Sequence, residues 1–157
     1  MTNVAKDSPL KPFAWQESCW SQLIQQHQSG RLPHALLIAG EEGVGKHHLA
    51  KAFAAYLLCR TPNNGACGTC ATCLLFAAGT HPDLLEIRPE SEGKQIRIEQ
   101  IRSLQQYANK TAQQGGFRVV ILKPADAMNI NAANALLKNL EEPGENILFI
   151  LFTNFIC

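Results

Sequence analysis

Two hydrophobic periodicities alternate along the chain. Four short runs are apolar or nearly so, as in strands that lie inside a parallel sheet. These runs are residues 35–39, 84–87, 119–122 and 147–152. Outside them, apolar residues recur three and four positions apart, which predicts helices. The helical segments are residues 15–28, 46–58, 98–112 and 132–142. Because strands and helices alternate, the pattern predicts an α/β fold, a three-layer α/β/α sandwich around a mainly parallel sheet.

The helical spacing also predicts which side chains face the core. In the first helix we expect an apolar face made of Trp15, Cys19, Trp20, Leu23 and Ile24. The corresponding faces of the other helices are Leu49, Phe53, Ala54 and Leu57; Ile98, Ile101, Leu104 and Ala108; and Ala133, Leu136, Leu137 and Leu140. Glycine and proline are expected to end the first helix, at Gly30 and Pro33, and the last one, at Pro143.

A glycine-rich turn follows the first predicted strand and precedes the second predicted helix. Its sequence, Gly-Glu-Glu-Gly-Val-Gly-Lys over residues 40–46, fits the phosphate-loop pattern G-x-x-x-x-G-K. The glycines let backbone N–H groups converge on a phosphate, the helix N-terminus adds positive potential, and Lys46 would reach the β- and γ-phosphates. The alternative is a plain glycine turn with a chance lysine, but the order of strand, loop and helix favours a phosphate loop. The candidate nucleotide-binding residues are Gly40, Gly43, Val44, Gly45, Lys46 and His47.

The two positions that would hold Mg²⁺ are both altered. His47 stands where the pattern has Ser or Thr, and an imidazole is a poor substitute for a hydroxyl oxygen as the ligand of a hard cation. Lys123 follows the run 119–122, where an acidic residue is expected, and Asp126 lies three residues further on. We therefore expect no ATP hydrolysis, no catalytic residue and no bound Mg²⁺. Binding of ATP or ADP without hydrolysis stays open, because Lys46 and the glycines are present.

Four of the six cysteines are clustered with the spacing C-x7-C-x2-C-x2-C. They are Cys59, Cys67, Cys70 and Cys73. A two-residue gap lets neighbouring thiolates converge on one ion, and four thiolates complete a tetrahedral structural zinc site. The alternatives are reduced, merely buried cysteines or a redox pair, but the ligand spacing favours zinc. Cys19 is expected to act as a small hydrophobic side chain of the first helix, and nothing supports a role for Cys157.

Composition and charge narrow the range of functions. The chain has 157 residues, of which 46% are apolar and 17% charged, as in an ordinary globular domain. A formal net charge of +1 is too small for a protein that grips DNA by itself, so any nucleic acid would be reached through an assembly. No apolar run follows a basic start and none is long enough to span a bilayer, so we expect a cytoplasmic protein without membrane contact.

Taken together, these features resemble the delta-prime and gamma/tau subunits of the bacterial DNA polymerase III clamp loader, in the AAA+ superfamily. Beside the phosphate loop and the cysteines, the matching segments are residues 32–38, 95–102 and 134–143. The resemblance covers about residues 14 to 153. It implies a DNA-replication subunit in a ring with gamma/tau and delta subunits. That ring opens the sliding clamp and places it on primed DNA as part of the polymerase holoenzyme.

Within that family, gamma/tau subunits keep both magnesium-site positions, whereas delta-prime subunits are altered there. His47 and Lys123 therefore move the resemblance toward the delta-prime type, and residues 125–129 look like its version of the second motif. The alternatives are an active gamma/tau-type ATPase and a truncated fragment without function.

The resemblance also predicts how the chain is divided. We expect an N-terminal arm at residues 1–13 and an AAA+ nucleotide-binding-like domain at 14–157, with the zinc module 59–73 inserted. The family continues into a Ser-Arg-Cys motif carrying an arginine finger, then lid and collar domains, which residues 154–157 do not resemble. We therefore expect a truncated chain in which the run 147–152 lacks a neighbouring strand, a state that invites aggregation.

Overall fold

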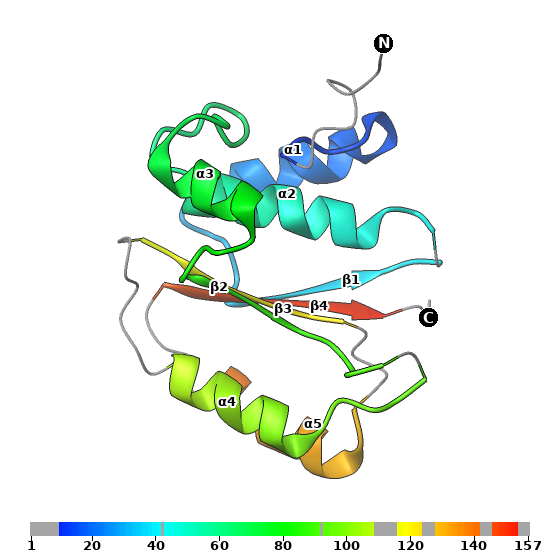
Figure 1. Ribbon diagram of the computed structural model, residues 1–157. Coiled ribbons are helices and arrows are strands. Elements are labelled where there is room, and N and C mark those ends of the chain that lie inside the picture. The colour runs from blue at the N-terminus through cyan, green and yellow to red at the C-terminus, as the bar shows by residue number, and fades with distance from the viewer. Residues whose placement is uncertain are drawn as a thin grey trace. The chain divides into compact units, whose positions relative to one another are not determined.

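The computed structural model contains helices alternating with parallel strands (Figure 1). It describes residues 10–41, 43–91, 93–108, 116–123, 128–141 and 146–153. The chain is divided into two compact units. The first comprises Met1–Pro33 and Gly43–His81, and the second His34–Glu42 and Pro82–Cys157.

The second unit is built on a four-stranded parallel sheet. Its strands are β1 (Ala35–Ala39), β2 (Leu84–Ile87), β3 (Arg118–Leu122) and β4 (Ile147–Thr153). They are ordered β1-β4-β3-β2. All four predicted strands are confirmed. The expectation that the last run lacks a neighbour is wrong, because β4 lies between β1 and β3 and pairs with both. Its backbone groups are therefore used on both sides.

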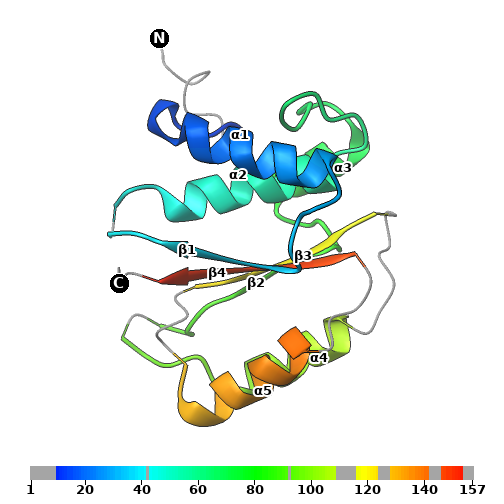
Figure 2. The same ribbon diagram turned by 180° about the vertical axis from the view of Figure 1, so that it is seen from behind.

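Two helices cover one face of this sheet, α4 (Ile98–Ala108) and α5 (Ile130–Glu141) (Figures 1 and 2). Apolar side chains from both helices and from three strands form the core between them. Its buried members are Ile87, Ile96, Ile101, Leu104, Val120, Leu122, Ala132, Leu136, Ile147 and Phe149. Helix α5 begins two residues before the predicted start. There Asn129 Oδ1 accepts the backbone N–H of Ala132 at 2.8 Å, as a side-chain cap does.

The predicted apolar face of α5 is displaced by about one position. Ala132 and Leu136 are buried in the core, with Ala135 and Leu140 packed beside them. Leu137 was expected on this face, but its side chain is 53% exposed. Since successive helical residues are about 100° apart, a stripe centred on Leu136 turns Leu137 away from the sheet. Strand β1 also departs from the prediction, because Leu37 is exposed instead of covered.

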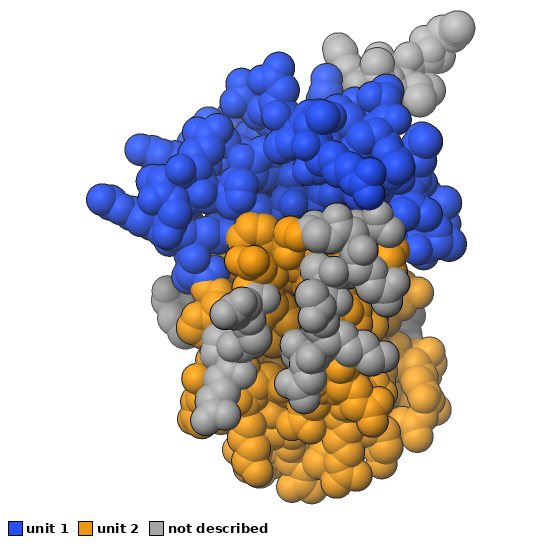
Figure 3. All heavy atoms as spheres, turned by 90° about the vertical axis from the view of Figure 1, so that its left-hand side faces the viewer, with its two compact units in different colours: residues 1–33, 43–81 blue, residues 34–42, 82–157 orange. Residues whose placement is uncertain are grey.

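The first unit (blue in Figure 3) is helical. It contains the short 3-10 turn η2 (Ala14–Gln16), α1 (Glu17–Gln28), α2 (Lys46–Leu58) and α3 (Ala71–Ala78). Helix α2 is buried nearly all round, from Leu49 onward, and not on one face alone as its spacing suggested. Helix α3 was not predicted, and only its first three residues lie within the predicted zinc module 59–73.

The apolar face predicted for the first helix is only partly correct. Trp20 and Ile24 are buried as expected. Trp15 is 69% exposed, because it belongs to the preceding 3-10 turn and is out of phase with α1. Cys19 is exposed too, at the margin of the buried stripe, so its expected role as a core side chain is wrong. No helix in the described part of the chain has the length and apolarity needed to cross a bilayer.

Candidate functional site

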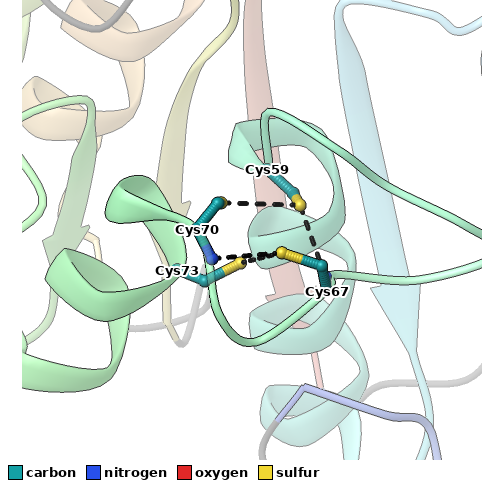
Figure 4. A group of neighbouring side chains, drawn as sticks. All are labelled: Cys59, Cys67, Cys70 and Cys73. Atoms are coloured by element: carbon teal, nitrogen blue, oxygen red, sulfur yellow. Dashed lines mark hydrogen bonds between the residues drawn. The ribbon is translucent and has the colours of Figure 1, made fainter.

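The four clustered cysteines come together in the first unit (Figure 4). Cys59 follows the last residue of α2, and Cys67 lies in the loop after it. Cys70 is the residue before α3, and Cys73 lies in the first turn of that helix. Their sulfur atoms all lie within 4.8 Å of one another. The fold therefore closes the x7 and x2 gaps of the sequence into one cluster.

The sulfur spacing fits a tetrahedral metal. Cys59 Sγ and Cys70 Sγ are 3.8 Å apart, and Cys67 Sγ and Cys73 Sγ are 3.9 Å apart. With zinc–sulfur bonds of about 2.3 Å, the edges of a regular tetrahedron of sulfurs are about 3.8 Å long. Four thiolates would fill every position and leave none for substrate. The arrangement therefore suits a structural ion and not a catalytic one.

Backbone N–H groups surround the sulfurs as they do in metal-thiolate sites. The N–H of Cys67 donates to Cys59 Sγ at 3.3 Å, and those of Thr69 and Cys70 donate to Cys67 Sγ at 3.4 and 3.2 Å. The hydroxyl of Thr61, together with the backbone and hydroxyl donors of Thr69 and the N–H of Cys70, lowers the pKa of Cys67 to about 5. Hydrogen bonds to the sulfur stabilise its anionic form, which is the form that ligates a metal.

The thiols of Cys70 and Cys73 differ in their acidity. At Cys70 burial raises the pKa, but hydrogen bonds led by the Thr72 hydroxyl outweigh it and lower the value to about 7. Burial raises the pKa of Cys73 to about 12, because its thiolate would be desolvated next to other sulfurs. A cation in the cluster would replace the proton of Cys73. Its positive charge would then stabilise the thiolate beside the other sulfurs. Among the described residues, these four cysteines are the group that could hold a metal ion.

The residues of the predicted phosphate loop are divided between the two units, with Gly40 in the second and Gly43 in the first. In the first unit, Gly43 and Gly45 have φ angles of +90° and +87°, in the left-handed region that glycine tolerates best. Gln16 Nε2 donates to the carbonyl oxygens of Val44 and Gly45, at 3.3 and 2.9 Å. The indole N–H of Trp15 also donates to Val44 O, at 3.2 Å. These donors hold the carbonyl side of the loop, a role that the sequence did not reveal.

The side chain of His48, next to the predicted magnesium position at His47, is held in place. Lys46 and His47 lie in the first turn of α2 and are half-buried. The ring of His48 stacks on Phe13 with centroids 3.9 Å apart, and its Nε2 is hydrogen-bonded to Lys11 O. His48 is thus committed to the N-terminal segment of the first unit.

In the second unit, the first glycine of the motif lies at the carboxyl edge of the sheet. The N–H of Gly40 donates to Thr153 O, at the end of β4, at 3.2 Å. Lys123 directly follows β3 and donates its N–H to Ile87 O at 3.0 Å. Because the strands are parallel, Lys123 and Gly40 lie at the same edge. Lys123, which stands where the motif has an acidic residue, thus lies at this edge of the sheet. Asp126 lies outside the described residues.

A buried ion pair in the second unit was missed by the sequence reasoning. The Nε of Arg118 lies 3.7 Å from Asp83 Oδ1, and their side chains are 3% and 0% exposed. The guanidinium also lies 3.9 Å from the ring centroid of Tyr107 and donates to its backbone carbonyl. The charged residue directly before the apolar run 119–122 was the available signal.

Comparison with known proteins identifies a family and a similar fold. A family model described as DNA polymerase III, delta subunit, matches residues 15–155. A crystal structure of a gamma subunit-related DNA polymerase III protein from Thermotoga maritima has a similar fold, with a TM-score of 0.61 at 25% identity. The match covers 88% of this chain and 38% of that one.

Bacterial relatives give the same result. The chain is 50% identical over 141 residues to DNA polymerase III subunit delta′ of Pseudomonas aeruginosa, covering 88% of this chain and 42% of that protein. It is 38% identical over 145 residues to the Escherichia coli delta′ subunit, covering 92% and 43%. It is 34% identical to the Escherichia coli tau subunit, covering 88% and 21%. The chain therefore spans about two-fifths of the length of these delta′ relatives. Since the family model matches most of its residues, the chain belongs to the DNA polymerase III delta subunit family, and the predicted resemblance to delta-prime subunits is confirmed.

Proposed function

We propose that this chain is part of a non-hydrolysing, delta-prime-type subunit of the DNA polymerase III clamp loader. The observation that carries the proposal is the altered magnesium site of a chain whose relatives are delta′ subunits. His47 lies in the first turn of α2 and Lys123 at the carboxyl edge of the sheet. Neither side chain offers the oxygen ligand that Mg²⁺ prefers. Without the cation, negative charge on the transferred phosphoryl group would lack its main stabilisation.

The partners and the wider architecture are part of the same proposal. The delta′ and tau relatives suggest a hetero-oligomeric ring with gamma/tau and delta subunits, which loads the sliding clamp onto primed DNA in the cytoplasm. In this proposal residues 14–157 form one AAA+ nucleotide-binding-like domain of three layers, with residues 59–73 as an inserted zinc module and residues 1–13 as an arm. The role of the cluster Cys59, Cys67, Cys70 and Cys73 is to hold structural zinc.

Nucleotide binding and turnover, measured on one sample with and without Mg²⁺, test the catalytic part of the proposal. We expect no release of phosphate in either condition. Any nucleotide binding should depend on Lys46, because its ammonium would face the β- and γ-phosphates. Mg²⁺-dependent turnover that disappears in Lys46→Ala would refute the proposal. It would favour an active gamma/tau-type ATPase, the alternative that the 34% identity to a tau subunit supports.

Metal content and assembly test the remaining parts separately. Four thiolates predict about one zinc per chain in protein purified without chelator. Mixing the chain with gamma/tau and delta subunits, followed by size-exclusion chromatography, should give a species that contains all three. Elution of the chain by itself would argue against assembly through these residues, whatever the zinc content.

A further inference from the structure

Trp20 lies where two ligand-bearing segments of the cysteine cluster meet α1. Its side chain is 6% exposed and meets the rings of Phe53 and Tyr56 of α2 nearly edge-on. The centroid distances are 6.1 and 6.2 Å, a geometry that fixes the orientation of an indole. Tyr56 O accepts the backbone N–H of Cys59 at 3.3 Å. The ring of Trp20 therefore packs against the turn of α2 that delivers Cys59.

The other side of the same indole holds the loop that leads to Cys67. Trp20 Nε1 donates to the carbonyl oxygen of Asn64 at 2.9 Å. Asn64 has a φ of +56°, in the left-handed region that few residues other than glycine, asparagine and aspartate visit. The turn around it is closed by the Asn63 N–H, which donates to Gly65 O at 2.9 Å. One hydrogen bond thus joins a buried ring to the middle of an irregular loop.

The space beside this hydrogen bond is open. A groove of about 610 Å³ lies between α1 and the loop, lined by Asn63–Ala66 on the loop side. On the α1 side its lining includes the polar side chains of Ser21, Gln25 and Gln28. The lining on this side also includes the apolar side chains of Trp20 and Ile24, and a Cβ added at Gly65 would lie 3.8 Å from the ring of Trp20. Trp20 therefore holds this loop against α1 both by its ring and by its hydrogen bond to Asn64 O.

We infer that Trp20 is a positioning residue for the metal site: its ring places Cys59 and its indole N–H holds the loop that delivers Cys67. The inference rests on the proposed zinc binding. Seven residues separate these two cysteines, against two in each of the other gaps, so this loop loses the most conformational entropy when the four sulfurs gather. A loop already held by Trp20 has less freedom to lose, which raises metal affinity without a new ligand.

Zinc affinity of the 157-residue chain, measured by competition with a chelator, tests the inference. Trp20→Phe keeps the aromatic packing and removes the N–H donor, and we expect about 10-fold weaker binding, as for loss of a hydrogen bond that supports a metal ligand. Trp15→Phe is the matched control. It also removes an indole N–H that donates to a backbone carbonyl, that of Val44, but touches no ligand-bearing segment. It should leave zinc affinity within about 2-fold of wild type, since surface substitutions have small effects.

Two further measurements separate the possible outcomes. The thiolate-to-metal absorption of the Co²⁺ form should be the same in Trp20→Phe and wild type, because the four ligands are unchanged. If Trp20→Phe does not fold, Asn64→Gly provides a second test. This variant keeps the left-handed backbone and the hydrogen bond from Trp20. Because glycine gives the metal-free loop more conformational freedom, zinc binding should be about 3-fold weaker. Wild-type affinity in the folded Trp20→Phe variant would overturn the inference, and wild-type affinity in Asn64→Gly would overturn its premise that the order of this loop sets zinc affinity. A wild-type chain that binds no zinc would instead refute the proposed zinc site.

Discussion

Replacing Arg118 with methionine would leave the buried carboxylate of Asp83 without the guanidinium beside it. Both side chains lie in the interior of the second unit, at 3% and 0% exposure, with Nε and Oδ1 3.7 Å apart. At that distance two unit charges attract by about 4.5 kcal/mol if the effective dielectric constant is about 20. Removing one partner of a buried ion pair usually costs about 3–5 kcal/mol, because the remaining charge stays desolvated. We expect a loss in this range, a large share of the stability of a small protein.

Urea unfolding followed by far-UV circular dichroism measures the effect. With an m-value of about 2 kcal/mol/M, a loss of 3–5 kcal/mol lowers the midpoint by about 1.5–2.5 M. Arg97→Met is the matched control, because Arg97 also pairs with a carboxylate, that of Glu90, but both side chains are more than half exposed. Its midpoint should stay close to that of wild type, since exposed ion pairs contribute little.

A double-mutant cycle decides whether the pair itself causes the loss. In the double variant Arg118→Met with Asp83→Leu no buried charge is left alone, so it should be more stable than Arg118→Met by itself. The reasoning is refuted if the two single losses add in the double variant, or if Arg118→Met and Arg97→Met have the same midpoint. Such results would mean that packing of the arginine stem, and not charge, accounts for the effect.

Three further predictions concern the first unit. Removing the proposed zinc with a chelator, or replacing Cys73 by serine, should lower the thermal midpoint of the chain, because a bound metal stabilises the folded state. Thermal unfolding of metal-loaded and metal-free protein tests this. Burial lowers the pKa of His27, which is hydrogen-bonded to the hydroxyl of Tyr56 at 2.9 Å. The unfolded chain therefore binds the proton more tightly, and stability should fall as the pH drops below about 6.5, a dependence that weakens in His27→Gln. Gly45→Ala should destabilise the chain more than Gly43→Ala. Both substitutions force alanine into the left-handed region, which costs about 1–2 kcal/mol. Only at Gly45 would the added methyl carbon also lie 2.9 Å from side-chain atoms. Equal urea midpoints of the two variants would contradict that ranking.

The candidate sites could be read from the sequence because each depends on neighbours in the chain. The glycines and lysine of residues 40–46 are consecutive, and the cysteines at 59–73 lie within one loop and one helical turn. Short spacing limits the conformations that can bring such groups together, so a ligand set is visible in the residue order. The four strands were predicted for the same reason, since an apolar run is a local property.

The tertiary structure decided what depends on residues far apart in the chain. Periodicity predicted the run at 147–152 as a strand but could not show that it lies between β1 and β3, with a neighbour on each side. It predicted Leu137 as a core residue, whereas a rotation of about one residue in α5 leaves that side chain exposed. Strand order and the rotation of a helix are fixed by packing against distant segments, and a hydrophobic pattern carries no information on which segments those are.

The sequence by itself therefore determined the α/β class, the phosphate-loop motif with its altered magnesium positions, and the cysteine set. Only the tertiary structure decided that Arg118 is buried beside Asp83 and that the indole of Trp20 holds Asn64 O, 44 positions away. The physical reason is that a polar group enters the interior only where a partner meets it there. Such partners come from other elements of the fold, so their identity is settled when the elements pack and not along the chain.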